Sequence, residues 1–469
     1  MTDIKKNDVL ELEIESIAFG GRGVAKIDHF VIFVRDTLPG QRVKALIIKK
    51  KAAFAEALVR EVLREAPGQI PAPCPYFRDC GGCRFQDLEY EKQLEMKRQM
   101  VSGVYRHLAG MPEIGIAEVL PAPDIYAYRN KMDFSTGVRR WRLKENDPGT
   151  DPHFAIGLHA PGRFDRVLDI DNCLLQDDER NRIFRTLRDW VRENGIPLND
   201  QREHRGFLRN VIIRKGAHSG EIMVNLVTRF RDADIFASLV KLLVEKYPAV
   251  TSIVNNITAS KGDHSIGEYE IRLHGAPVIH DRLGEYEYQI SANAFFQTNT
   301  RGAEQLYDTL VNMAEFKKDE VVWDLYCGTG TISLYAAGHV RKVFGFELVG
   351  DAVANARENA RRNHVDNCEF FEADLDHFWR DRRELIASLE KPDLAVVDPP
   401  RAGLNPGFIK QLIALQPSRI LYVSCNPSTQ ARDIVRLAES GYRSKKIQPV
   451  DMFPHTAHIE TVALLKKEI

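Results

Sequence analysis

Three short apolar segments in the last third of the chain each end in residues that can take part in chemistry. They are Ile420–Val423 before Ser424-Cys425-Asn426-Pro427, Leu394–Val397 before Asp398-Pro399-Pro400-Arg401, and Val321–Asp324 before the turn Tyr326-Cys327-Gly328-Thr329-Gly330. From about residue 292 such segments alternate with helical stretches such as Ala352–Asn363, which predicts a mostly parallel sheet. The carboxyl ends of parallel strands share one edge, where cofactors and substrates bind. We therefore expect an α/β fold with a Rossmann-like domain whose functional crevice holds a thiol, a carboxylate and a glycine turn.

The chain of 469 residues is long enough for several domains, and its pattern predicts three. Residues 1–66 are predicted to form a small OB-like β-barrel of the kind that binds RNA, because short alternating strands are separated by glycine and proline turns. Residues 67–290 are predicted to form a central, mostly-β domain that begins with a cysteine-rich loop and a helix over residues 86–108. Residues 291–469 are predicted to form the Rossmann-like domain. Strands of the central domain are expected at Phe207–Arg214, Glu221–Thr228, Ser252–Asn256 and Tyr286–Ser291, and a polar loop at Trp141–Pro152.

The composition excludes some classes of protein and leaves one local patch to explain. No apolar run approaches the roughly 20 residues of a membrane helix, and the N-terminus lacks the apolar core of a signal peptide, so we expect a cytoplasmic protein without a membrane partner. The formal net charge of -1 does not indicate a general nucleic-acid binder. Contact with RNA must come from local patches, and Arg42–Arg64 is a candidate because it holds seven basic side chains and two glutamates. The alternative is an ordinary solvated surface.

Cysteines cluster in one loop of the predicted central domain. Cys74, Cys80 and Cys83 lie within ten residues, and glycines 81 and 82 allow the backbone to pass close to any group that the sulfurs hold. Cys173 is the natural fourth thiol. Four thiolates suit either a tetrahedral zinc ion or a [4Fe–4S] cluster, and the spacing does not decide between the two. The alternative is that the cysteines hold no metal, and Cys173 by itself is equally consistent with a small buried apolar residue.

The glycine turn after Asp324 predicts a nucleotide-like cofactor. Glu347 ends the next strand, about 20 residues after the turn, where a carboxylate can accept hydrogen bonds from ribose hydroxyls. The third glycine of a pyrophosphate-binding fingerprint is missing, so S-adenosylmethionine fits better than NAD. Asp374 ends the strand after that and can contact an adenine amino group. A turn or helix-cap aspartate is the alternative.

A cysteine beside a methyl donor indicates covalent chemistry. Carbon 5 of uracil is a poor nucleophile, but attack of a thiolate on carbon 6 makes it reactive, and a base must afterwards remove the proton on carbon 5 so that the thiol can leave. Cys425 is the predicted nucleophile and Glu460, at the start of an apolar strand, the predicted base. His455 and His458 are alternative bases. A target base inside folded RNA has to be flipped out to reach such a site.

With these motifs the chain resembles the RNA uridine-5 methyltransferases, which make 5-methyluridine in 23S rRNA and tRNA. The resemblance covers nearly the whole chain. It rests on Phe295-Phe296-Gln297-Thr298-Asn299, Asp324–Gly330, Asp398-Pro399-Pro400-Arg401, Val423–Pro427, Asp451-Met452-Phe453-Pro454 and His458-Ile459-Glu460. It implies Cys425 as nucleophile and Glu460 as base. It also implies that the cofactor, S-adenosylmethionine, is surrounded by Gln297, Tyr326, Glu347, Asp374 and Asp398.

The resemblance also concerns the first two predicted domains. The N-terminal segment is similar to the family's RNA-binding TRAM barrel, and Cys74, Cys80, Cys83 and Cys173 match the family's [4Fe–4S] ligands. A barrel and a full cysteine set favour 23S rRNA over tRNA as the substrate, since the family's compact tRNA enzymes lack both. At Thr331, Asp374 and Ala402 the chain departs from residues that occur in other members.

The expected function is S-adenosylmethionine-dependent methylation of uracil carbon 5 in structured RNA, with 23S rRNA favoured, by a monomeric enzyme. One alternative within the family is a tRNA uridine-5 methyltransferase. A second is a non-catalytic RNA-binding protein that keeps the cluster. Retention of both Cys425 and Glu460 argues against this second alternative, because binding alone requires neither. A third is methylation of cytosine carbon 5, which also uses a cysteine.

Overall fold

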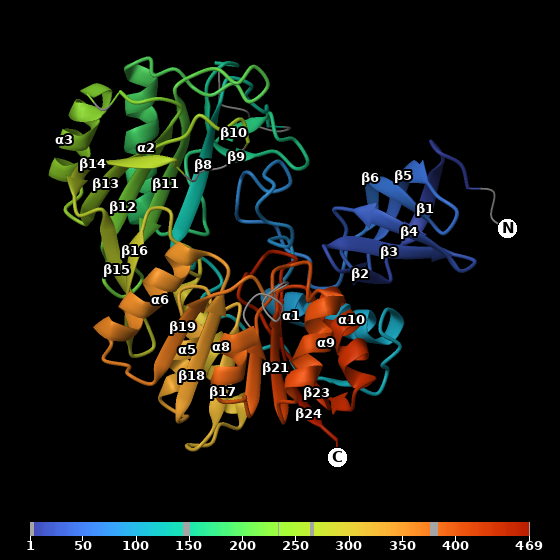
Figure 1. Ribbon diagram of the computed structural model, residues 1–469. Coiled ribbons are helices and arrows are strands. Elements are labelled where there is room, and N and C mark those ends of the chain that lie inside the picture. Colours follow the sequence, from blue (N-terminus) through green and yellow to red (C-terminus); the bar gives the residue numbers. More distant parts are fainter. Residues whose placement is uncertain (1–3, 144–150, 233, 263–266, 376–382, 469) are drawn as a thin grey trace. The chain divides into compact units, whose positions relative to one another are not determined.

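The computed structural model describes residues 4–143, 151–232, 234–262, 267–375 and 383–468, shown in Figure 1. The chain forms two units, each assembled from separate stretches of sequence. Unit 1 contains Met1–Ala72, Arg84–Pro123 and Gln305–Ile469, and unit 2 contains Pro73–Cys83 and Asp124–Glu304. The predicted boundaries at residues 66 and 290 describe consecutive domains and stay predictions. Among the described residues, no helix combines the length and the apolar character that crossing a membrane requires.

The N-terminal part of unit 1 is a small sheet in the order β1-β5-β6-β4-β3-β2. Its strands are β1 (Val9–Glu13), β2 (Ser16–Ala18), β3 (Arg22–Ile27), β4 (Phe30–Arg35), β5 (Arg42–Lys50) and β6 (Phe54–Arg64). Alternate residues along these strands, such as Val43, Ala45 and Ile47 of β5, are completely buried and form a core of their own. This alternation is the pattern that predicted a small β-barrel, and β1 also contacts β3, as expected when a sheet curls on itself.

The rest of unit 1 is an open sheet in the order β19-β18-β17-β20-β21-β24-β23-β7. Its strands are β7 (Gly115–Ile116), β17 (Val321–Leu325), β18 (Lys342–Glu347), β19 (Cys368–Glu372), β20 (Leu394–Val397), β21 (Arg419–Ser424), β23 (Lys446–Val450) and β24 (Glu460–Lys467), with β22 (Tyr442–Arg443) paired to β24. Strands β19, β18, β17, β20 and β21 are parallel to one another, which confirms the predicted Rossmann-like domain. The central strands are buried on both faces, as their continuous apolar runs require.

Helices cover this sheet, and Figure 1 shows α9 and α10 beside β21. The helices of unit 1 are α1 (Tyr90–His107), α5 (Thr331–Ala337), α6 (Gly350–Arg362), α8 (Arg383–Ser388), α9 (Pro406–Leu415) and α10 (Pro427–Ala438), and α4 (Thr300–Ala314) contains the boundary between the units. Apolar side chains of α9 and α10, such as Phe408 and Ile434, join those of β17 and β21 in one core. The predicted helices at residues 86–108 and 352–363 correspond to α1 and α6.

Unit 2 contains a mixed sheet in the order β10-β9-β8-β11-β12-β13-β14, with α2 and α3 side by side in Figure 1. Its elements are β8 (Lys131–Gly137), β9 (Ala155–His159), β10 (Val167–Asp169), α2 (Asp178–Glu193), β11 (Leu208–Lys215), β12 (Ile222–Thr228), η1 (Asp234–Phe236), α3 (Ala237–Lys246), β13 (Val250–Ile257), β14 (Tyr269–Gly275), β15 (Val278–Leu283) and β16 (Tyr286–Ser291). Strands β11, β12, β13 and β16 lie within two residues of the predicted ones. The predicted loop at Trp141–Pro152 falls partly on residues 144–150, which lie outside the described residues.

Candidate active site

The sheet of unit 1 has a topological switch point, which is where open α/β sheets bind their ligands. From β17 the chain proceeds through β18 to β19 on one side, and then returns to β20 and β21 on the other side of β17. The strand order therefore reverses between β17 and β20. The turn after β17 and the residue after β20, Asp398, lie at the carboxyl ends of these two adjacent strands.

Cys425 and Glu460 meet at the same edge because β24 is antiparallel to β21. The register pairs Ser424 at the end of β21 with Thr461 near the start of β24. Cys425, one residue after Ser424, and Glu460, one residue before Thr461, are therefore opposite one another. Cys425 is half-buried and Glu460 is 9% exposed. The pairing of two strands thus brings together the predicted nucleophile and the predicted base.

The loop that carries Cys425 is fixed by a helix cap and by a neighbouring loop. Asn426 is the N-cap of α10: its side-chain oxygen accepts the Ser428 N–H at 3.1 Å, and Pro427 occupies the first turn, where its missing N–H costs nothing. The Asn426 side-chain amide also donates to the Arg401 carbonyl at 2.9 Å. This bond ties the loop after β21 to the Asp398–Arg401 loop after β20.

Four ionisable groups at this edge influence one another. Burial, and then the charge of Asp398, raises the pKa of Glu460 to about 8, while Arg401 opposes the rise. Burial, and then the charge of Asp324, raises the pKa of Asp398 to about 7. Burial and the charge of Glu460 raise the pKa of the Cys425 thiol, which Arg401 again opposes by charge and by a hydrogen bond. The predicted nucleophile, base and Asp398 therefore share one low-dielectric site with a guanidinium at its rim.

The turn after β17 approaches its surroundings closely. Tyr326 has a φ of +73°, unusual for a bulky side chain and typical of functional sites. Gly330 has a φ of +81°, and a Cβ there would lie 3.0 Å from Phe370 and 3.1 Å from Ala356. The Gly328 N–H donates to one carboxylate oxygen of Glu347 at 3.1 Å, and the Val349 N–H donates to the other at 2.9 Å. Glu347 is thus oriented at the end of β18, and each oxygen keeps a second lone pair for a ligand.

The remaining predicted cofactor contacts are placed differently. Asp374 is exposed and lies two residues beyond the end of β19, at the same edge as Glu347. Gln297 belongs to unit 2, where it is half-buried and its backbone carbonyl accepts a 2.7 Å hydrogen bond from Asn130. The structure therefore brings Tyr326, Glu347 and Asp398 to one edge of the sheet, with Asp374 at its periphery. Gln297 belongs to the other unit.

The sequence motifs assign no role to two charged groups at this edge, Asp324 and Arg401. Asp324 is completely buried in β17, where its carboxylate accepts the Ser333 hydroxyl at 2.6 Å, and burial raises its pKa to about 6. An acidic residue inside an otherwise apolar strand is the sequence signal that could have identified it. Arg401 is exposed at the rim, 3.3 Å from the Nδ1 of His458. Its electrostatic effect on Cys425 and Glu460 depends on tertiary proximity, for which the sequence holds no signal.

The two alternative bases occupy different environments. His455 is buried, has a φ of +63°, and forms hydrogen bonds to Gln93 through its backbone N–H at 3.0 Å and its ring Nδ1 at 3.1 Å. Its carbonyl accepts the backbone N–H groups of Arg84 and Phe85. His455 therefore supports the loop from inside, whereas His458 is half-buried beside Arg401.

A buried ion pair anchors the segment that leads to Glu460. Lys97 of α1 lies 2.6 Å from Asp451, with side chains 1% and 0% exposed, and Tyr90 donates a 3.0 Å hydrogen bond to the same carboxylate. Burial lowers the pKa of Lys97, which Asp451 opposes. Helix α1 thus holds the Asp451–Pro454 loop from which the chain passes to β24.

Replacing Asp451 by asparagine is expected to destabilise the protein by about 3–5 kcal/mol, because it leaves the Lys97 ammonium buried without a counter-charge. Urea unfolding of the purified protein measures this change. Glu118→Gln is the matched control, since Glu118 pairs with Arg98 of the same helix at the surface, where such pairs contribute under about 1 kcal/mol. Equal effects of the two substitutions would contradict an anchoring role for Asp451.

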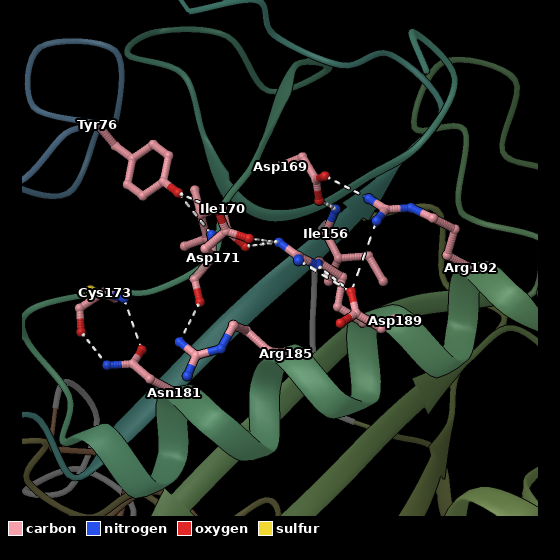
Figure 2. Close-up of polar contacts among 11 residues, drawn as sticks. Tyr76, Ile156, Asp169, Ile170, Asp171, Cys173, Asn181, Arg185, Asp189 and Arg192 are labelled. Carbon is pink, nitrogen blue, oxygen red and sulfur yellow. Dashed lines mark hydrogen bonds and ion pairs between the residues drawn. The ribbon is translucent and has the colours of Figure 1, made fainter. Parts of the chain in front are cut away.

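The four cysteines of the predicted cluster all belong to unit 2, and Figure 2 shows how their loops are held. The Tyr76 hydroxyl accepts the Asp171 N–H at 2.9 Å, which ties the loop of Cys74, Cys80 and Cys83 to the segment before Cys173. Asn181 of α2 accepts the Cys173 N–H at 2.9 Å and donates to the Cys173 carbonyl at 3.1 Å. Both loops are therefore anchored by side chains outside the cysteine set.

The cysteine thiols affect one another electrostatically. Burial raises the pKa of Cys74 and of Cys173, and it raises that of Cys80 to about 12. The charge of Cys173 contributes to the rise at Cys74 and Cys80, and Cys83 contributes at Cys80. Backbone N–H groups oppose these rises, among them Gly82, which lies 3.3 Å from the Cys80 sulfur. Among the described residues, no three Cys, His, Asp or Glu side chains converge closely enough to hold one metal ion.

The basic Arg42–Arg64 stretch is less cationic than its sequence indicates. Four of its seven basic side chains lie within 4 Å of glutamates on the barrel, in the pairs Arg42–Glu11, Lys44–Glu61, Lys49–Glu56 and Arg64–Glu13. Two others, Lys50 and Lys51, lie over the rings of Phe30 and Phe54. Glu11 and Glu13 of β1 lie outside the stretch, so they offset positive charge that its own composition leaves unbalanced.

Comparison with known proteins agrees with this geometry. The model of the tRNA (uracil-5-)-methyltransferase family matches residues 216–468, and that of the TRAM domain matches residues 5–59. An uncharacterised RNA methyltransferase of Chlorobaculum tepidum is 40% identical over 99% of this chain and 97% of its own length. One of Halalkalibacterium halodurans is 36% identical over 99% and 98%.

A solved structure also matches along nearly the whole chain. The tRNA (uracil-54, C5)-methyltransferase of Pyrococcus abyssi, in complex with S-adenosyl-L-homocysteine, is 30% identical, with a TM-score of 0.74 over 97% of this chain and 99% of that one. The chain therefore belongs to the tRNA (uracil-5-)-methyltransferase family of RNA methyltransferases and carries an N-terminal TRAM domain.

Proposed function

We propose that the protein methylates carbon 5 of a uracil in structured RNA through a transient bond between Cys425 and carbon 6, with S-adenosylmethionine as the methyl donor. The observation that carries this proposal is the placement of Cys425 opposite Glu460 at the switch-point edge of the sheet. The Pyrococcus abyssi relative, solved with the demethylated form of that donor, supports the choice of cofactor.

The residues of unit 1 supply each protein step of this reaction. The Cys425 thiolate adds to carbon 6 and pushes electron density to carbon 5, while Arg401 stabilises the thiolate charge. Bound S-adenosylmethionine supplies the electrophilic methyl group that carbon 5 takes. Glu460 then removes the proton from carbon 5, the bond between Sγ and carbon 6 breaks, and the RNA leaves with a 5-methyluracil at the target position and with the Cys425 thiolate restored.

The cofactor would be held by residues already oriented for it. The two Glu347 oxygens, fixed by the Gly328 and Val349 N–H groups, would accept hydrogen bonds from the ribose hydroxyls, and the Tyr326–Gly330 turn would allow the cofactor to approach the backbone closely. Asp398 would hold the aminium end of the cofactor or the edge of the target base, Asp374 would contact the adenine, and Gln297 would add a further contact.

The pH dependence of kcat follows from the ionisation of Glu460, which every turnover requires. With its pKa raised to about 8, the carboxyl is mostly protonated at pH 7 and cannot act as a base. The raised pKa of Cys425 acts in the same direction, because the thiolate is the attacking form. We expect kcat to rise about tenfold for each pH unit below about 8, because the Glu460 carboxylate must be ionised before the proton of carbon 5 can be removed. A profile that is flat from pH 6 to 9 would contradict the roles of both groups.

For the RNA substrate we propose 23S rRNA, which the family resemblance implies. A tRNA is the second candidate, and the whole-chain match to a tRNA enzyme favours it. Mass spectrometry of 23S rRNA and tRNA from cells with and without the gene tests both. Loss of one 5-methyluridine from either RNA supports the proposal and identifies the substrate, and an unchanged 5-methyluridine content in both refutes it. RNA containing 5-fluorouridine rather than 5-fluorocytidine should trap the enzyme, which separates uracil from cytosine methylation.

We also propose that Cys74, Cys80, Cys83 and Cys173 hold a [4Fe–4S] cluster with a structural role. The mutual effects of the thiols and the N–H groups aimed at sulfur support this donor set. A four-iron cluster binds each thiolate through a different iron, so its ligands need not converge on one point.

Metal analysis after anaerobic purification is expected to give about four irons per chain and a brown protein, since each Cys ligates one iron of the cluster. Cys173→Ser should lose most of this iron. Cys368→Ser is the matched control, because Cys368 lies in unit 1 at the start of β19 and should keep the full amount. One zinc per chain without iron would contradict the cluster.

A further inference from the structure

Unit 2 contains a cavity of about 760 Å³ that is lined mainly by arginines. The arginines are Arg139, Arg140, Arg142, Arg163, Arg166 and Arg202. They come from the segment after β8, the turn between β9 and β10, and the turn before β11. Asp200 is the one carboxylate among the lining residues. Six arginines and one aspartate give the lining a strong local excess of positive charge, although the formal net charge of the whole chain is only -1.

Among the described residues, half of these arginines have no neighbouring carboxylate to offset their charge. Arg139 lies 3.6 Å from Asp200, and Arg202 lies 2.5 Å from Asp165. Within the part of the chain that the structure describes, Arg142, Arg163 and Arg166 have no carboxylate within 4 Å. Arg142 and Arg163 are exposed and Arg166 is half-buried, so their guanidinium groups remain available to an anion.

The backbone beneath the cavity is fixed. The Trp141 N–H donates to the Val167 carbonyl at 2.7 Å, and the Val167 N–H donates to the Arg139 carbonyl at 3.3 Å. The Trp141 ring also lines the cavity, and its Nε1–H donates to Asp79 at 3.0 Å. Asp79 belongs to the cysteine loop, so that loop helps to set the position of the indole.

The chemistry of the lining selects a polyanion with aromatic groups. Guanidinium forks match phosphate oxygens in pairs, and arginine is the residue of choice for phosphate and nucleic-acid recognition. An indole beside them offers a face on which an unpaired base can stack. A cavity of this size accommodates a nucleotide-sized group.

We infer that this arginine cavity is an RNA-docking site, in which phosphates of the substrate RNA bind Arg142, Arg163 and Arg166 and an unpaired base stacks on Trp141. The inference rests on the proposed function only in taking RNA as the substrate. The site consists of unit 2 residues alone, and it includes none of the residues proposed for catalysis. Because phosphate contacts carry no sequence information, this site would increase the affinity for RNA and position it, but would not select the target sequence.

The test compares two triple variants of the full-length protein. Arg142→Gln/Arg163→Gln/Arg166→Gln removes charge from the cavity. Arg231→Gln/Arg272→Gln/Arg282→Gln removes the same charge from exposed positions of unit 2 outside it. Fluorescence anisotropy with a 23S rRNA transcript and with total tRNA, each at several KCl concentrations, gives Kd and its salt dependence.

The cavity variant is expected to bind its RNA at least about tenfold more weakly, with the slope of log Kd against log salt reduced by about two to three. The control variant should change Kd less than about threefold. Equal losses in the two variants, or an unchanged slope in the cavity variant, would overturn the inference. Thermal melting confirms that each variant is folded.

A second measurement does not depend on removing any charge. A photo-crosslinking residue in place of Phe164, which is 65% exposed beside Arg163, should crosslink RNA, and the same residue at Tyr269, 50% exposed on β14, should not. Crosslinking at neither position, or equally at both, would overturn the inference. Failure of the proposed function would appear separately, as unaltered protein that binds RNA at the cavity but transfers no methyl group to uracil.

Discussion

The Cys425→Ala variant is expected to transfer methyl groups to RNA at least about 10⁴-fold more slowly than the unaltered protein, because carbon 5 of uracil is not nucleophilic until a thiolate has added to carbon 6. The measurement is incorporation of label from S-adenosylmethionine into RNA under single-turnover conditions. RNA binding should be retained, since the substitution removes one half-buried sulfur and no charge that contacts phosphate.

Cys368→Ala provides the matched control for this prediction. Cys368 is also half-buried and lies at the start of β19, at the opposite end of its strand from the candidate site. It should keep methyl transfer within about threefold of the unaltered protein. If Cys425→Ala and Cys368→Ala were equally active, Cys425 could not be the nucleophile.

The Glu460→Gln variant is expected to behave differently from Cys425→Ala, because Glu460 acts after the methyl group has been transferred. Glutamine cannot accept the proton of carbon 5, so the bond between Cys425 and carbon 6 cannot break. Turnover should fall by about 10²–10⁴-fold, the range of general-base catalysis. Methylated RNA should meanwhile accumulate on the protein as a complex that resists denaturation.

Gel electrophoresis of the denatured reaction mixture detects this complex. Glu468→Gln is the control: Glu468 follows β24 at the surface, so the same change there should leave turnover intact and trap no RNA. A Glu460→Gln variant that turns over normally, or that releases methylated RNA without any trapped complex, would refute the role of Glu460 as the base.

The same substitution should also change how stability depends on pH. Burial raises the pKa of Glu460 from 4.5 to about 8, so the folded protein binds this proton more tightly than the unfolded chain does. The resulting stabilisation is complete below pH 4.5 and is lost as the pH rises through about 8. A glutamine at this position does not ionise, so the Glu460→Gln variant does not lose this stability as the pH rises. Its melting temperature should therefore fall less between pH 6 and pH 9 than that of the unaltered protein.

Much of the site followed from local patterns, because the ends of buried strands are recognisable in sequence. Apolar runs that end in Asp398 or Cys425 predicted the strands β20 and β21, and the parallel arrangement placed their ends together. The pairing of Glu460 with Cys425 depends on the antiparallel register of β24, which is set by packing and not by local composition.

Long-range contacts could not be predicted from the sequence. Lys97 and Asp451 are 354 residues apart in the chain and form one buried pair. The cysteine loop of residues 73–83 belongs with residues 124–304, whereas the helix α1 that follows it belongs to the other unit. The glutamates that pair with Arg42 and Arg64 lie on β1, a strand distant from these arginines in sequence.

The comparison weakens one argument from the sequence without deciding it. The barrel and the cysteine set favoured 23S rRNA because compact tRNA enzymes of the family lack both. The Pyrococcus abyssi tRNA enzyme, however, matches 97% of this chain, so a chain of this length and architecture does not by itself exclude a tRNA substrate. The distinction depends on RNA contacts, which is why the arginine cavity and the mapping of 5-methyluridine matter.

The central claim is that Cys425 becomes bonded to a uracil ring. The most direct test incubates the protein with S-adenosylmethionine and RNA that contains 5-fluorouridine, in which the fluorine on carbon 5 cannot leave as a proton does. Mass spectrometry of the digested complex should find a methylated fluorouridine on the peptide that contains Cys425. An adduct on any other residue, or methyl transfer to unmodified RNA without any adduct to the fluorinated one, would contradict the claim.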